Sequence, residues 1–366
     1  MNSSDILHRR LSFQHLNSEP FTTPQAVVRH FGAVQAQEYA DAKWALGLRL
    51  GSVTEDAVEK ALDEGDILRT HIMRPTWHFV TPDDIRWLTA LTAPRVKIKM
   101  AYYERLLELS EDVFSRSRAA LTGALSEGKA LTRKELGDVL EGAGVPGAKG
   151  QRLGHLLIQM ELEALITSGP RRGKGFTYML LEERVPAARE LVGEEALGEL
   201  TRRYFGSHGP ATPQDFAWWS GLTVADAKQG LELLGSELER EVVRGQTYAF
   251  APSSVALSSA VSETSATMHL LPWFDEYTVA YKDRAFVFGS DAKPHMTSDY
   301  DNLSRTVLLD GRAVAFWKRT VGRDSVSIDV RPFRALSEAE KEDLQREAER
   351  FRRFLGVAEV DLNGIS

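Results

Sequence analysis

Residues 67–80, ILRTHIMRPTWHFV, decide the fold that we predict for the first part of the chain. Residues 67–71 and 76–80 alternate between polar and apolar side chains like two strands, and Met73, Arg74 and Pro75 form the turn of a hairpin between them. Helices are expected before this hairpin. Three helices followed by a hairpin predict a winged helix, a module that normally places a helix in a DNA groove and its wing on the backbone.

Several segments with the sequence features of helices precede the hairpin. Residues 6–16 form an amphipathic pattern, and a helix starts at Pro24, capped by Thr22 or Thr23 and stopped by Gly32. Further helices are expected over residues 41–50 and 53–62.

The same order of elements returns twice further along the chain. A capping box at Thr132 opens a helix, residues 151–164 form another, and strands at 165–168 and 176–180 flank the glycine-rich tip at 169–175. A third set runs from Pro213 to a hairpin around Arg244 and Gly245. We therefore predict an α+β fold with three tandem winged-helix modules, over residues 1–108, 109–185 and 186–253.

The last third of the chain has a different pattern. The Ser- and Ala-rich residues 251–267 indicate a boundary, followed by strands at 268–271, 277–281, 285–288, 306–309, 313–320 and 325–330, with residues 289–305 as a loop. Asp310-Gly311 predicts a hairpin turn, and residues 337–354 an amphipathic helix. Residues 254–366 are therefore expected to form a small β-sheet or barrel with a covering helix.

Composition limits the classes of function. Of 366 residues, 43% are hydrophobic and 27% charged, which is typical of a globular protein. The chain shows no signal peptide or membrane span, so we expect a cytoplasmic, nucleoid-associated protein. It contains no cysteine, and its histidines lack a metal-ligand spacing, so no metal or other cofactor is expected.

The net charge of -7 argues mildly against DNA binding by bulk attraction, but basic residues are clustered. The clusters lie at residues 95–99, 149–152, 171–174 and 312–323. They fit either a DNA-facing side or an ordinary solvated surface.

Gln35 and Gln37 stand one residue apart, after an apolar helical run and before another. If Ala36 is extended, both carboxamides point the same way, because side chains alternate along a strand. The pair could hold a water or a polar ligand without acting as a base, or it could be an ordinary surface pair. Such a mild catalyst suits a purine that already carries positive charge through alkylation at N7 or N3, because departure of that base needs no protonation.

Three stretches together resemble the AlkZ-like DNA glycosylases, a winged-helix family that also contains the YcaQ-like enzymes. They are residues 31–45 with the Gln-Ala-Gln motif, residues 69–80, and residues 270–284, which include Asp275 and Glu276. The resemblance implies a monofunctional glycosylase in which Gln35 and Gln37 are catalytic. Gln37 would position the water, and Gln35 would support the water and the sugar. In the YcaQ-like branch an aspartate holds the second position, so Gln37 is typical of the AlkZ-like side.

Other polar residues have both a functional and a structural interpretation. His71, Arg74 and His78, on or beside the first hairpin, are predicted to bind DNA, although a histidine there could instead cap backbone groups. Asp275 and Glu276 could orient the catalytic loop or pair with Arg284. The predicted DNA contacts of the second module, where the wing tip could also be a charged flexible loop, are Lys149, Arg152, Arg171, Arg172 and Lys174.

The expected partner is double-stranded DNA containing alkylated purines, bound by a monomer. The alternative function is a non-catalytic winged-helix transcription regulator, although the chain shows no obvious dimerisation helix.

Overall fold

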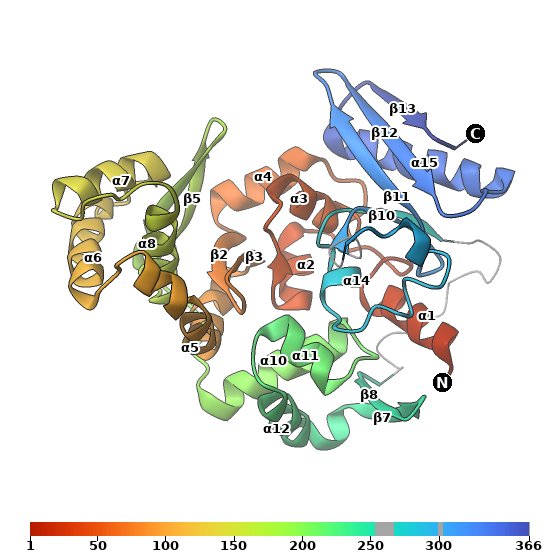
Figure 1. Ribbon diagram of the computed structural model, residues 1–366, viewed down its shortest axis with the longest axis horizontal. Helices are drawn as coiled ribbons and strands as arrows, with labels where there is room; N and C mark the ends of the chain where they lie inside the picture. The colour runs from red at the N-terminus through yellow and green to blue at the C-terminus, as the bar shows by residue number, and fades with distance from the viewer. Residues whose placement is uncertain (253–266, 299–302, 366) are drawn as a thin grey trace.

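The computed structural model describes residues 1–252, 267–298 and 303–365 (Figure 1). Within these ranges the protein is a mixed α+β structure with four small β-sheets. Their strand orders are β1-β3-β2, β4-β6-β5, β7-β8 and β13-β12-β11-β10-β9. The predicted α+β class is confirmed.

The first part of the chain consists of helices followed by a hairpin. Its elements are α1 (Ser3–Phe13), α2 (Pro24–Phe31), β1 (Val34–Gln35), α3 (Tyr39–Gly47), α4 (Glu55–Glu64), β2 (Leu68–Ile72), β3 (Thr76–Val80) and α5 (Pro82–Leu106). Thr23 caps α2 by accepting the Ala26 N–H, and Gly32 ends it at a φ of 83°. Antiparallel pairing places Gln35 opposite His78, and His78 opposite Thr70. The glutamine motif therefore joins the hairpin as its third strand.

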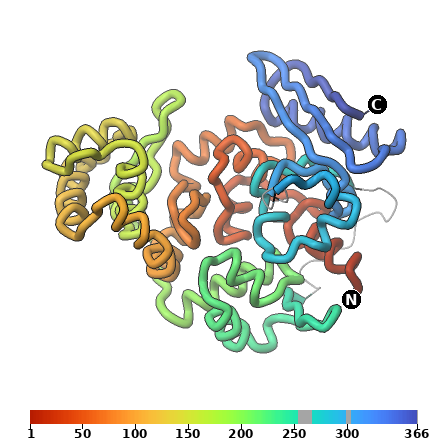
Figure 2. The backbone as a smooth tube through the Cα atoms, viewed as in Figure 1, coloured from red at the N-terminus to blue at the C-terminus, as the bar shows by residue number. Residues whose placement is uncertain are grey.

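The second part forms a separate lobe, at the left of Figures 1 and 2. It contains α6 (Glu111–Leu125), β4 (Leu131–Thr132), α7 (Arg133–Gly142), α8 (Gly150–Leu162), β5 (Ile166–Arg172), β6 (Gly175–Leu180) and α9 (Leu181–Arg184). The capping box at Thr132 is confirmed, since Thr132 and Glu135 bond each other's backbone N–H groups. The hairpin turns at Gly173, at a φ of 60°.

The third part repeats the order of helices and hairpin. Its elements are α10 (Gly193–Ser207), α11 (Pro213–Ser220), α12 (Val224–Leu234), η1 (Gly235–Glu237), β7 (Glu239–Val243) and β8 (Gln246–Phe250). Trp219 is fully buried in the core. Trp218 is 41% exposed and donates its indole N–H to the Val279 carbonyl.

The C-terminal part is a curled five-stranded sheet covered by a helix. It comprises β9 (Met268–Leu271), α14 (Glu276–Val279), η2 (Lys293–His295), β10 (Thr306–Leu309), β11 (Arg312–Val321), β12 (Ser325–Pro332), α15 (Glu338–Leu355) and β13 (Glu359–Asn363). The predicted covering helix and the Asp310-Gly311 turn are confirmed. The final strand β13, parallel to β12, was not predicted.

The strands predicted at residues 277–281 and 285–288 are wrong. Residues 276–279 form α14, because the Asp275 side chain accepts the Tyr277 N–H and caps a helical turn. Residues 285–288 belong to turns. The cap and the burial of the whole run override the strand propensity of its aromatic and β-branched residues.

Two of the apolar cores are built from segments that lie far apart in the sequence. One core joins α1–α4 to the C-terminal sheet, and in it Trp44 packs 4.9 and 5.0 Å from the rings of Phe351 and Phe354. A second joins the β2–β3 hairpin and α5 to α10–α12, whereas a third lies within the second lobe. The predicted domain limits stay predictions, and those near residues 253–254, with most of the Ser- and Ala-rich run and part of the 289–305 loop, lie outside the described residues. No helix in the described ranges is long and apolar enough to cross a membrane.

Candidate active site and nucleic-acid interface

Gln35 ends β1 and is only 6% exposed. Its backbone N–H donates to Glu276 Oε1 at 2.8 Å, and its side-chain Oε1 accepts a hydrogen bond from the Arg74 guanidinium. Strand pairing puts Gln35 on the same face of the hairpin as His78 and Thr70. Both backbone and side chain of this glutamine are therefore held in place by charged groups.

Gln37 lies two residues further on, at the surface. Its Oε1 accepts the Trp77 N–H at 3.3 Å, while the Ala36 N–H donates to the Trp77 carbonyl at 2.7 Å. The first glutamine is thus fixed in the protein, and the second reaches solvent from the same hairpin. The carboxamide N–H groups of Gln37 have no partner in the described part of the chain, so they can meet a ligand.

Arg69 supports the backbone between the glutamines, a role that the sequence analysis missed. Its Nε and one terminal nitrogen donate to the Ala36 carbonyl at 3.1 and 3.0 Å. The guanidinium lies over the rings of Trp77 and Phe176, 4.3 and 4.8 Å from their centres. Burial lowers the pKa of Arg69 to about 10, so it stays charged at neutral pH. Its place in the family-like stretch was the signal that could have identified it.

Glu276, for which the sequence leaves two roles open, is the second group that supports the glutamines. Fully buried, it accepts the Gln35 N–H on one oxygen and the Trp219 indole N–H, at 2.9 Å, on the other. His208 Nε2 lies 3.2 Å from that second oxygen. Burial alone would raise the pKa of Glu276, but His208, the Gln35 N–H and the charge of Arg74 hold it below its usual value. Glu276 is therefore an ionised support for the glutamine strand, consistent with the loop-orienting alternative.

Its neighbour Asp275 has a different partner. Both carboxylate oxygens of Asp275 bind the buried guanidinium of Arg49 at 2.8 Å. Arg284 pairs with neither acid, and instead donates to the Thr278 carbonyl at 2.6 Å. The predicted alternative of an ion pair with Arg284 is therefore wrong.

The two histidines of the hairpin have unlike surroundings. His78 is fully buried, with Nδ1 2.9 Å from the Thr76 carbonyl, as in the backbone-capping interpretation. Burial, aided by the charge of Arg74, lowers the pKa of His78 to about 3, so the ring is neutral. In that state Nδ1 donates the proton, and Nε2 is an acceptor with no partner among the described residues.

His71 is 6% exposed and lies between the lobes. Its Nδ1 is 2.6 Å from Glu161 of α8, and its ring centre is 3.9 Å from that of Trp77. The structure thus places His71 in the packing of the first hairpin against the second lobe. Its predicted contact with DNA stays a prediction.

The basic residues of the second lobe differ in how exposed they are and in what they bind. Lys174 is exposed at the wing tip, Lys149 is 75% exposed beside Glu141, and Arg172 is 55% exposed beside Glu135. Arg171 is less available, since it binds Glu59 of α4 at 3.0 Å and its backbone N–H binds Asp63. Arg152 donates to the Leu107 carbonyl at the end of α5. Their roles in DNA binding also stay predictions.

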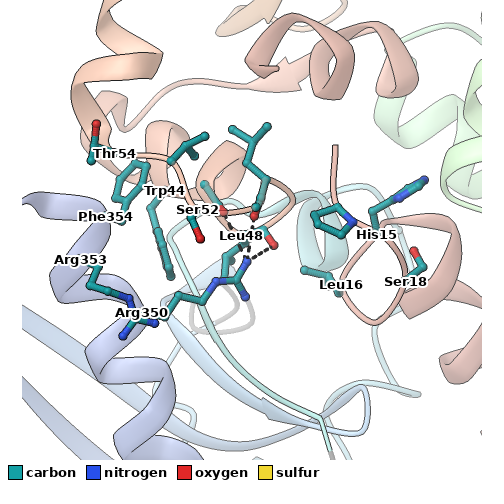
Figure 3. A pocket seen from close by; sticks show the side chains of 15 residues that line it. His15, Leu16, Ser18, Trp44, Leu48, Ser52, Thr54, Arg350, Arg353 and Phe354 are labelled. Carbon is teal, nitrogen blue, oxygen red and sulfur yellow. Dashed lines mark hydrogen bonds between the residues drawn. The ribbon is translucent and has the colours of Figure 1, made fainter. Parts of the chain in front are cut away.

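A hollow of about 460 Å³ lies away from the glutamine motif, between the end of α3 and α15 (Figure 3). Arg350 reaches across it and donates to the carbonyls of Gly47, Leu48 and Leu50. Those carbonyls end or follow a helix, where backbone carbonyls need donors from outside the helix. The hollow contains none of the predicted site residues, so we assign it to the packing of the C-terminal helix.

The fold and the glutamine pair, with the contacts that support it, match one class of enzyme. A sequence model of the family described as DNA glycosylase AlkZ-like matches residues 28–354, so the chain belongs to the AlkZ-like DNA glycosylases. It is similar to the interstrand DNA cross-link repair glycosylase of Streptomyces sahachiroi, with 26% identity over 356 residues that cover 93% of this chain and 94% of that protein. The solved structure of the Streptomyces sahachiroi DNA glycosylase AlkZ superposes with a TM-score of 0.82 at 21% identity, covering 99% of both chains.

Proposed function

We propose that this protein is a monofunctional DNA glycosylase that hydrolyses the N-glycosidic bond of purines alkylated at N7 or N3. Gln35 and Gln37 would be its catalytic residues. The observation that carries the proposal is the support around the pair, in which Arg69 holds the intervening carbonyl and Glu276 the Gln35 N–H. Neutral side chains on a backbone held this firmly are suited to orienting reactants.

In the proposed reaction, water attacks C1′ of the deoxyribose while the bond from C1′ to the purine nitrogen breaks. The electron pair of that bond stays on the base and cancels its positive charge, so the leaving group needs no acid. The Gln37 carboxamide accepts a hydrogen bond from the water and aims its oxygen at C1′, and the water proton passes to solvent. Gln35, fixed by Arg74, supports the water and the sugar.

The exposed position of Gln37 also bears on substrate size. A site that opens to solvent can admit an adduct too bulky to be enclosed. The relative from Streptomyces sahachiroi is named for interstrand cross-link repair, and we extend that substrate class to this chain as part of the proposal.

The three sets of helices and hairpin would act as winged-helix modules around duplex DNA. The proposed contacts are Arg74 and His71 in the first module, and Lys149, Arg152, Arg171, Arg172 and Lys174 in the second. His78, which is fully buried, would support this surface without touching DNA. We expect a monomer working on cytoplasmic, nucleoid-associated DNA without a metal.

The test is incubation with a duplex carrying a single 7-methylguanine, followed by alkali. We expect strand cleavage at the lesion only after alkali, since hydrolysis leaves an abasic site and not a nick. Borohydride should trap no covalent adduct, because the motif contains no amine. Absence of cleavage on both this duplex and one with a bulky N7 adduct, together with sequence-selective binding to undamaged DNA, would favour the regulator.

A further inference from the structure

The tip of the β2–β3 hairpin is held from two sides. The Met73 N–H donates to Thr92 Oγ1 of α5 at 3.1 Å. Gly221, at the end of α11, packs so closely that a Cβ atom there would lie 1.9 Å from the Met73 oxygen and 3.6 Å from Arg74 Cγ. The part of α5 that follows Thr92 by one to three turns therefore starts next to Arg74 and Gln35.

Four cations gather at this place: Arg74 at the tip, Arg95 and Lys99 on α5, and Arg284 after α14. A guanidinium N–H of each arginine is buried without a hydrogen-bond partner in the described part of the chain. After burial, the charges of Arg74 and Arg95 lower the pKa of Lys99, and that of Arg74 lowers the pKa of Arg284 to about 10. The cations are thus close enough to repel one another.

The nearby carboxylates offset the repulsion between these cations only in part. Glu276 acts on Arg74 through space, but its oxygens are already bound by Gln35, Trp219 and His208. Asp215 and Asp283 act on Arg284 in the same indirect way. A cluster of cations whose hydrogen bonds go to neutral groups, at one end of the glutamine strand, is a ready site for anions.

Apolar side chains continue the same helix outward. Ile98, Tyr102 and Leu106 are 66%, 62% and 64% exposed, and the adjacent Tyr103 is 45% exposed. Arg95, Lys99 and Tyr102 follow at intervals of four and three residues, so they lie on one face of α5. Scattered exposed apolar residues are ordinary, but four of them beside a cationic cluster form a surface suited to nucleic acid.

We propose that the exposed face of α5 from Arg95 to Leu106, together with Arg74 and Arg284, is a contact surface for duplex DNA. The exposed Lys99 binds a backbone phosphate next to the nucleotide at Gln35 and Gln37, the three arginines behind it add to the positive field there, and Tyr102 with Ile98 packs on sugars and base edges. The surface deepens the proposed function and rests on it for the nucleotide's place at the glutamines. α5 runs between the second lobe and α10–α12, beside the β2–β3 hairpin (Figure 1).

The length of this helix face suits duplex DNA. Arg95 and Tyr102 are seven residues apart, which is about 10 Å along a helix at ~1.5 Å per residue. Duplex DNA advances ~3.4 Å per base pair, so this face spans about three base pairs. The cations would then follow the backbone as it leaves the glutamine site, with the rings at the far end.

The experiment is fluorescence anisotropy with a labelled, undamaged duplex over a range of salt concentrations. The variants are Lys99→Ala and Tyr102→Ala, with Lys341→Ala on α15 and Val242→Ala on β7 as controls of similar chemistry. We expect Lys99→Ala to weaken binding several-fold and to reduce the slope of log affinity against log salt by about 1. Tyr102→Ala should weaken binding about tenfold with an unchanged slope, and the controls should bind like the wild type.

Two results would overturn the inference. One is wild-type affinity and salt slope in both variants, with circular dichroism showing that they are folded. The other is that Tyr102→Ala changes only the sedimentation of the protein, which would assign the apolar face to a second copy of the chain.

Binding to undamaged duplex requires no excision, so it is separable from the proposed function. If the wild type does not excise the lesion but the variants lose DNA affinity as expected, the glycosylase proposal fails and the surface stands. If the wild type excises the lesion and the variants bind normally, only the surface fails.

Discussion

At the scale of single residues, the glutamine pair depends on neighbours that carry charge. Gln35 is bound through its N–H by Glu276 and through its side chain by Arg74, and the carbonyl that follows is bound by Arg69. These three groups come from positions up to 241 residues away in sequence. The position of the glutamine pair is therefore set by the buried charges around it.

Arg69→Lys should slow excision with little change in DNA affinity. A lysine keeps the charge but cannot supply the two N–H groups that Arg69 aims at the Ala36 carbonyl, and it loses the flat contact with Trp77 and Phe176. We expect a single-turnover rate about tenfold lower, from a misplacement smaller than the 1 Å that can cost ~100-fold. Arg346→Lys, at an exposed position on α15, is the control. An unchanged rate in Arg69→Lys would show that this support is unnecessary.

Glu276→Gln should lower stability as well as the rate, because the amide offers only one acceptor oxygen to the Gln35 and Trp219 donors. The expected loss in the free energy of unfolding at pH 7 is about 1–3 kcal/mol. Since the folded pKa of Glu276 is below its unfolded value, this loss should shrink as the pH falls below ~4.3, where the unfolded carboxylate takes up its proton. Urea titrations of both proteins at several pH values measure the difference. A pH-independent difference would mean that the charge of Glu276 contributes nothing.

At the scale of elements, the hairpin β2–β3 is the part on which the others converge. The glutamine strand pairs with it, α5 binds its tip, the turn after α11 packs on it, and Arg69 on β2 reaches back to the motif. Its position therefore decides the geometry of the site.

Gly221→Ala should displace this hairpin. Gly221 has a φ of 73°, and the new Cβ would lie 1.9 Å from the Met73 oxygen. The matched control is Gly356→Ala at the end of α15, with a φ of 70° and open space around it. We expect the control to lose about 1 kcal/mol of stability from backbone strain alone, and Gly221→Ala to lose more and to excise more slowly. Equal effects in thermal unfolding and excision would contradict the contact.

Sequence reasoning was most successful where signals are local. The first hairpin, the Thr132 capping box and the Asp310-Gly311 turn follow from short patterns, and all three are present. The strand expected at residues 277–281 failed because the Asp275 cap and complete burial outweigh propensity. The roles of Arg69 and Glu276 could not be read from spacing, since each depends on a contact between distant segments.

At the scale of the whole molecule, the first part and the C-terminal sheet share a core, and the hairpin shares another with α10–α12. Three histidines lie in these regions, the buried His78 and His269 and the partly buried His30, and burial lowers the pKa of each to about 3. They couple the stability of the protein to pH.

Stability should fall steeply as the pH drops from 7 to 5. The folded histidines stay neutral while the unfolded chain, with an ordinary pKa of ~6.5, binds protons, so acid favours unfolding. Each histidine should contribute about 2 kcal/mol over this range, or ~6 kcal/mol for the three. His269→Leu should remove about 2 kcal/mol of the dependence, as measured by urea unfolding at each pH. A wild-type stability that is flat between pH 7 and 5 would refute the neutral, buried state of these rings.

The most direct test of the central claim is the single-turnover release of 7-methylguanine from a duplex by the wild type, Gln37→Ala and Gln35→Ala. We predict that Gln37→Ala lowers the rate by about 100-fold or more while DNA affinity and thermal stability stay near wild type, because the exposed carboxamide places water and does not support the fold. Gln35→Ala should lower both rate and stability, since Gln35 is buried against Arg74. A wild-type rate in Gln37→Ala would contradict the account.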